Sequence, residues 1–121
     1  MRIYLAGPYQ PKSKNKHKCV REAAQNTDRA IVTGLELMKK GHVVYIPHLA
    51  HFIHTHHKCD REWSWHAYDR SFLEHWAEAL YYMAASKGAN AELRRAKELG
   101  ITIFYRISKV PKGRDMIIRA R

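Results

Sequence analysis

The feature that most constrains this chain is an alternation of short apolar runs with longer segments of helical spacing. Four apolar runs are interpreted as strands, and they are 2–7 (RIYLAG), 42–47 (HVVYIP), 79–84 (ALYYMA) and 101–106 (ITIFYR). They are continuously apolar instead of alternating with polar residues, which is typical of strands buried on both faces of a parallel sheet. Strands of this kind separated by helices predict an α/β fold, a doubly wound (Rossmann-like or flavodoxin-like) parallel sheet of four to five strands with helices on both faces.

Three segments between these runs have the spacing of helices. From Cys19 to Lys40 apolar or small residues recur every three or four positions, and Gly41 follows as a typical helix stop. A second helix is expected from Ser64 to Glu78 and a third from about Gly88 to Leu99.

Two further segments are harder to interpret from the sequence. The stretch rich in histidine and aromatic residues, from Pro47 to about Trp63, is expected to be a loop. Near the end of the sequence, 115–120 (DMIIRA) is expected to form a fifth strand or a short helix. No repeat or linker divides the chain, so residues 1–121 are expected to form a single domain.

Composition limits the function classes. The 22 Lys and Arg against 11 Asp and Glu give a net charge of +11, which suits an anionic partner such as a phosphate ester or, less favoured, a nucleic acid. No apolar run approaches the roughly 20 residues of a membrane span, so no membrane partner is expected. Cys19 and Cys59 are far apart and form no CxxC motif, which favours a reducing, cytoplasmic location.

Ligands of such sheets bind beyond the carboxyl ends of the strands. Three segments follow strand ends here, at Gly7-Pro8, after Pro47, and at 86–88, and they are expected to converge on one cleft. Glu92 is expected in the first turn of the helix that begins near Gly88, on the buried side with Ala96 and Leu99. A carboxylate there is costly unless it has a partner or a catalytic use, although favourable interaction with the helix dipole is a structural alternative.

Three motifs, IYLAGPY at 3–9, YDRSFLEHWAEALYYM at 68–83 and SKGANAELRRAKELGI at 86–101, carry a resemblance. The chain resembles the nucleoside 2-deoxyribosyltransferase-like superfamily, and within it the small bacterial and phage branch similar to nucleoside 5′-monophosphate N-glycosidases. The resemblance extends from Arg2 to about Phe104. It implies a doubly wound parallel sheet, usually assembled as a homodimer or a larger homo-oligomer.

The resemblance also implies roles for individual residues. Glu92 takes the place of the nucleophile, Tyr4 that of the tyrosine that holds it, and Asp69 that of the group that protonates or positions the leaving base. The position six residues before the nucleophile is an acid in transferases of free nucleosides and a phosphate-binding serine in 5′-monophosphate hydrolases, and this chain has Ser86. Substrate contacts are expected from seven residues in all: Gly7, Pro8, Tyr9, His48, Ser86, Gly88 and Ala89.

The chemistry of these residue types fits the same reaction. A carboxylate can attack C1′ and form a glycosyl-enzyme, as in retaining glycosidases, while a second acid protonates the leaving base. A serine hydroxyl and N–H groups at a helix N-terminus suit a 5′-phosphate. We therefore predict cleavage of the N-glycosidic bond of a nucleoside or 2′-deoxynucleoside 5′-monophosphate. Base exchange by a deoxyribosyltransferase and a non-catalytic module that binds nucleotides or nucleic acid are the alternatives.

The histidine-rich segment raises the question of a metal. Five histidines and Cys59 lie close together in PHLAHFIHTHHKCD, and zinc uses such ligands, but the spacing matches no standard zinc finger. We therefore expect no metal and no cofactor. Trp63, Trp65 and Tyr68 are expected in the core or a subunit interface, with stacking on the substrate base as the alternative.

Overall fold

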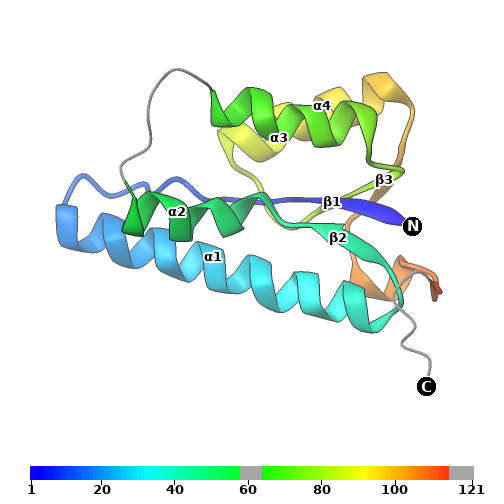
Figure 1. Cartoon of the computed structure of the whole chain (residues 1–121), viewed down its shortest axis with the longest axis horizontal. Helices are drawn as coiled ribbons and strands as arrows, with labels where there is room; N and C mark the ends of the chain where they lie inside the picture. Colours follow the sequence, from blue (N-terminus) through cyan, green and yellow to red (C-terminus); the bar gives the residue numbers. More distant parts are fainter. Residues whose placement is uncertain (58–63, 115–121) are drawn as a thin grey trace.

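The computed structural model describes residues 1–57 and 64–114 (Figure 1). Four parallel strands form one sheet in the order β2-β1-β3-β4. They are β1 (Arg2–Ala6), β2 (Val43–Tyr45), β3 (Ala79–Tyr82) and β4 (Thr102–Phe104). The all-parallel sheet with its helices confirms the predicted α/β doubly wound fold. The strand order reverses between β1 and β3, so the switch point, where such sheets bind ligands, lies between these two strands.

Helices cover both faces of the sheet (Figure 1). The long helix α1 (Lys16–Lys39) lies on one face, and α3 (Trp65–His75) and α4 (Lys87–Leu99) lie on the other. Three short elements complete the described chain, and they are η1 (Pro47–Leu49), α2 (Ala50–His56) and η2 (Ile107–Lys109).

Strand β1 is the centre of the core because it is buried on both faces. Ile3 and Leu5 point into the layer under α1, while Tyr4 points into the layer under α3 and α4, and none of the three is exposed to solvent. Such two-sided burial explains why this run is continuously apolar. On the α1 side the helix approaches the sheet closely, because a Cβ at Gly34 would overlap the side chain of Ile46.

The predicted helices are present, with shifted ends. Helix α1 begins before Cys19 because Asn15 Oδ1 caps its first turn and accepts from two backbone N–H groups. Helix α3 ends at His75, short of the expected Glu78.

The prediction of a loop after Pro47 is wrong for the described residues, because η1 and α2 occupy 47–56. Pro47 is at the start of η1, where its missing N–H costs nothing. His48 and His51, three positions apart, are both buried, so tertiary burial organises this polar-looking segment.

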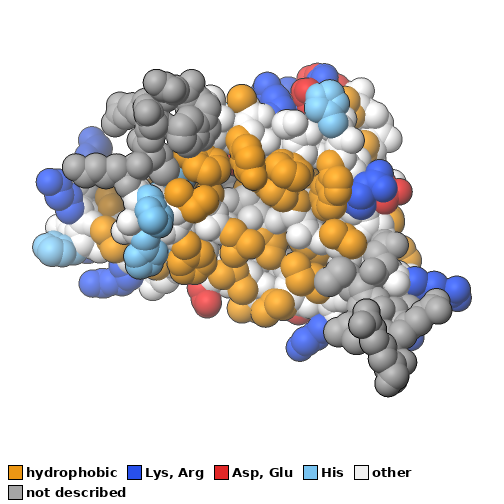
Figure 2. All heavy atoms as spheres, viewed as in Figure 1, with side chains coloured by type: hydrophobic (Ala, Val, Ile, Leu, Met, Phe, Trp, Pro, Cys, Tyr) orange, Lys and Arg blue, Asp and Glu red, His pale blue; other side chains and the backbone are white. Residues whose placement is uncertain are grey.

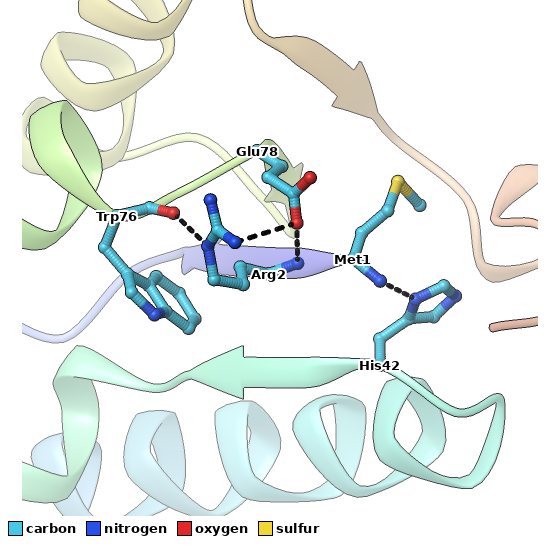
Figure 3. Close-up of polar contacts among 5 residues, drawn as sticks. All are labelled: Met1, Arg2, His42, Trp76 and Glu78. Atoms are coloured by element: carbon cyan, nitrogen blue, oxygen red, sulfur yellow. Dashed lines mark hydrogen bonds and ion pairs between the residues drawn. The ribbon is translucent and has the colours of Figure 1, made fainter. Parts of the chain in front are cut away.

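The amino ends of the strands are held by polar contacts (Figure 3). The Arg2 guanidinium donates to Trp76 O at 2.7 Å, and Glu78 accepts from the backbone N–H of Arg2 at 3.0 Å. On the other side of β1, the Met1 ammonium lies 2.9 Å from His42 Nδ1. These contacts join β1 to its neighbours at the edge opposite to the strand carboxyl ends.

The expected fifth element at 115–120 lies outside the described residues, as do Cys59 and Trp63. Within the described helices, none is long and apolar enough to cross a membrane.

Candidate active site

Buried Tyr4 and half-buried Glu92 form a hydrogen-bonded pair between the sheet and α4. The side chain of Tyr4 has no solvent exposure, and its hydroxyl donates a hydrogen bond to Glu92 Oε2. Burial, reinforced by the charge of Asp69, raises the pKa of Glu92 to about 7, against the opposing effects of the Tyr4 hydrogen bond and Arg70. A half-buried carboxyl group with a pKa near neutrality, which accepts a tyrosine hydroxyl, is the kind of group that active sites contain.

The start of α4 corrects one expectation about Glu92. The helix begins at Lys87, with Ser86 as its N-cap, so Glu92 lies in the second turn and not in the first. Because the effect of the helix dipole falls off within the first turn, a dipole role no longer accounts for this carboxylate.

Asp69 forms a second tyrosine–carboxylate pair beside the first. From α3 its Oδ1 accepts the Tyr45 hydroxyl at 2.8 Å, and the Tyr45 ring stacks on Phe72 with ring centroids 4.0 Å apart. Burial raises the pKa of Asp69, while the Tyr45 hydrogen bond and the nearby His66 and His54 oppose that rise. The site therefore holds two partly desolvated carboxyl groups, each with a tyrosine donor.

Tyr45 is a functional candidate that the sequence reasoning missed. Its neighbour in the sheet is Tyr4, and register partners on adjacent parallel strands point to the same face. The strand 42–47 was predicted, but its register against β1 depends on tertiary pairing that the local sequence does not encode.

The loop after β1 is held by histidines of the next segment. His48 is buried, and its Nε2 lies 3.1 Å from both Gly7 O and Pro8 O, so this nitrogen donates to the loop backbone. Tyr9 Oη lies 2.9 Å from His51 Nδ1. Burial lowers the pKa of His48, which favours the neutral ring. These contacts give His48 a role in holding the loop, and its Nδ1 is buried away from solvent.

Met83, directly after β3, contacts the beginning of the same loop. Met83 N donates to Ala6 O at 2.8 Å, and a Cβ at Gly7 would lie 3.0 Å from Met83 Sδ. Packing against Met83 therefore accounts for the glycine at Gly7. The loop after β1 and the segment after Pro47 are thus in contact, as expected, while the convergence of 86–88 with them stays a prediction.

The start of α4 offers fewer free donors than expected. Ser86 Oγ accepts from Ala89 N at 3.0 Å, and Ala89 is buried, so the expectation that the Ala89 amide faces a substrate is wrong for this conformation. The Ser86 hydroxyl proton and the N–H groups of Lys87 and Gly88 remain for a ligand, because the first N–H groups of a helix have no partner within it.

Gly88 has no explanation in the fold. It lies within α4 without a positive φ, and a Cβ there would meet no heavy atom within 4 Å. Glycine in a helix costs about 1 kcal/mol relative to alanine. The space beside the Gly88 backbone is therefore open to a ligand.

The hollows of the described surface and the placement of possible metal ligands also bear on the site. Two shallow hollows of the described surface are lined by residues of α1 and by 103–109, away from the carboxylates, so neither is the expected cleft. Among residues 1–57 and 64–114, no three His, Cys, Asp or Glu side chains converge as metal ligands would.

No family model matches the chain, and no curated protein and no solved structure is significantly similar to it. The site therefore has to be judged from its geometry.

Proposed function

We propose that this protein cleaves the N-glycosidic bond of a nucleoside 5′-monophosphate and releases the free base. The observation that carries the proposal is the Tyr4–Glu92 hydrogen bond beside the Tyr45–Asp69 hydrogen bond, near the switch point of the sheet. Of these two carboxyl groups with raised pKa values, Glu92 can act as the nucleophile and Asp69 as the acid.

In the first step, ionised Glu92 forms a bond to C1′ while the bond from C1′ to the base nitrogen breaks. The electron pair of that bond leaves with the base, which takes a proton from Asp69. The developing positive charge on the sugar is stabilised by the carboxylate, as in retaining glycosidases. Tyr4 orients the carboxylate by donating to its other oxygen.

In the second step, water attacks C1′ and the ester bond to Glu92 breaks. The water proton goes to the Asp69 carboxylate, which restores both groups to their starting protonation. These steps use only water and side chains of this chain.

The 5′-phosphate is assigned to the start of α4. The Ser86 hydroxyl and the N–H groups of Lys87 and Gly88 are the donors there, and charge-assisted hydrogen bonds to phosphate are each worth roughly 1.5–3 kcal/mol. An acid in place of Ser86 would repel a phosphate, which is why hydrolysis of a monophosphate is preferred to base exchange on free nucleosides.

A second copy of the chain is proposed as the partner. Four apolar side chains of η1, α2 and α3 are about half exposed, namely Leu49, Phe52, Ile53 and Tyr68. Figure 2 shows apolar side chains gathered across this view, with Lys and Arg mainly around the margins. Because the chain carries a charge of +11, an uncharged face lets two copies associate without opposing like charges.

The proposal is tested by incubating the protein with nucleosides and their 5′-monophosphates and measuring free base. We expect base release, faster from the monophosphates. Release of a base only when a second base is supplied would favour base exchange, and tight binding of nucleotides without any release would favour the non-catalytic module.

A further inference from the structure

The segment between β1 and the first turns of α1 carries positive charge that the proposed chemistry does not use. Its five cations, here called the basic rim, are all exposed: Lys12, Lys14, Lys16, Lys18 and Arg21. No side chain of the basic rim forms an ion pair with an acid of the described residues. The only acid within 10–22 is Glu22.

The Glu22 carboxylate binds the backbone of the loop and, within the described part of the chain, forms no ion pair with its lysines. Its Oε2 accepts from the backbone N–H of Lys12 at 2.9 Å and of Ser13 at 3.3 Å. The Cys19 thiol donates to Ser13 O at 2.6 Å, and the Asn15 side chain caps α1. The backbone is therefore fixed by its own side chains, while the lysine ammonium groups are left to solvent.

The basic rim starts at the edge of the sheet that carries the candidate site. The loop leaves β1 at Gly7, and Asn26 Nδ2 donates to Tyr9 O at 3.2 Å, which ties the beginning of this loop to α1. Figure 1 shows the start of α1 at the same end of the molecule as the carboxyl end of β1. A chain bound along the basic rim would thus lie at the same end of the sheet as the candidate site.

The length of the basic rim exceeds what one monophosphate needs. With about 3.3 Å per extended residue over 12–15 and 1.5 Å per helical residue over 16–21, it spans up to roughly 20 Å. This length is enough to contact several successive phosphates of one strand. The four lysines at every second position from 12 to 18 supply repeated positive charge along it.

We infer that the basic rim binds the phosphate backbone of single-stranded nucleic acid, without reading the bases. Contacts through phosphates supply affinity and orientation but no sequence preference. The restriction to a single strand rests on the proposed function, because a stacked and paired nucleotide cannot reach a buried carboxylate. Bound in this way, a strand presents one of its nucleotides at the site of Glu92.

The test is fluorescence anisotropy with a labelled oligonucleotide of about 12 nucleotides and mixed sequence, as a single strand and as a duplex. The variant Lys12→Gln/Lys14→Gln/Lys16→Gln/Lys18→Gln removes four rim charges. The matched control, Lys39→Gln/Arg106→Gln/Lys109→Gln/Lys112→Gln, removes four exposed charges outside the rim.

We expect the rim variant to bind the single strand at least about tenfold more weakly than the wild type at low salt. Its slope of log K against log salt should fall by about 3, since each lost phosphate contact accounts for about 0.7. The control should stay within about threefold of the wild type. Circular dichroism checks folding, and the milder pair Lys14→Gln/Lys18→Gln, expected to lose about threefold, tests the same claim should the fourfold variant unfold.

Three results would overturn the inference: no binding by the wild type at low salt, equal losses in the rim variant and its control, or equal affinity for single strand and duplex. Because binding is measured without turnover, the outcome is separate from that of the proposed function. A wild-type protein that binds the strand but releases no base would contradict the proposed function and leave the basic rim assignment standing.

Discussion

Tyr4 and Tyr45 are register partners on neighbouring strands, with ring centroids 5.6 Å apart. Each hydroxyl donates to a different carboxylate, Tyr4 to Glu92 and Tyr45 to Asp69. The sheet thus sets the relative positions of two carboxyl groups that come from different helices. Because both tyrosines point to the same face, the spacing of the strands fixes the spacing of the acids.

Glu92 should make stability depend on pH. Its pKa of about 7 lies above the ordinary value of 4.5, so between these pH values the folded protein keeps a proton that the unfolded chain has lost. Stability therefore falls as pH rises through this window, by up to about 3 kcal/mol. Glu92→Gln lacks this loss. Its stability relative to that of the wild type should therefore be higher at pH 8 than at pH 5.

Urea unfolding at the two pH values measures this difference. Glu36→Gln, at an exposed position of α1, is the matched control, and its difference in stability from the wild type should be nearly the same at both pH values. An equal effect of Glu92→Gln at pH 5 and pH 8 would contradict a raised pKa at Glu92.

The hydrogen bond from Tyr45 should affect the pKa of Asp69 and the rate of the reaction. The hydrogen bond from Tyr45 lowers the pKa of Asp69, so Tyr45→Phe should raise that pKa and move the limb of the pH–rate profile that Asp69 controls to higher pH. Loss of orientation should also lower kcat by about three- to tenfold, equivalent to roughly 1 kcal/mol for one hydrogen bond. Tyr68→Phe removes a nearby exposed hydroxyl and should leave the profile in place. An unchanged profile in Tyr45→Phe would separate Tyr45 from the chemistry.

Ser86 and Gly88 should set the preference for a phosphate. For one base and one sugar at fixed ionic strength, kcat/KM of the wild type should be at least about tenfold higher for the monophosphate than for the nucleoside. Ser86→Asp should shrink or invert this ratio by charge repulsion. Gly88→Ala should stabilise α4 by about 0.5–1 kcal/mol and still lower the ratio, because its methyl group enters the space assigned to phosphate. Equal use of nucleoside and monophosphate by the wild type would remove the phosphate assignment.

The apolar face formed by η1, α2 and α3 should associate with a second copy. Sedimentation at micromolar concentration should show a dimer or larger oligomer for the wild type, and Phe52→Glu should shift it to monomer by placing a desolvated charge in the contact. Tyr105→Glu, an equally exposed aromatic position after β4, should not change the assembly. A wild-type protein that sediments only as a monomer would contradict this proposal.

The sequence predicted the fold well, because continuous apolar strands and helical spacing are local patterns. It also singled out Glu92, whose contact with Tyr4 the structure contains. What it missed depends on tertiary structure. Tyr45 becomes visible only through the register of β2 against β1. The helix α2 was missed because burial of His51 organises a segment that is polar in sequence. The start of α4 was placed too late because Ser86 caps the helix without the acidic partner of a capping box.

The most direct test of the central claim compares base release by the wild type and by Glu92→Gln, with a nucleoside 5′-monophosphate in excess. Glutamine keeps the shape and can still accept the Tyr4 hydrogen bond, but it does not supply the anionic nucleophile. We predict that the rate falls by about 100-fold or more, equivalent to about 3 kcal/mol of barrier, while the variant remains folded. A folded Glu92→Gln protein that releases base at the wild-type rate would contradict the assignment of Glu92 as the nucleophile.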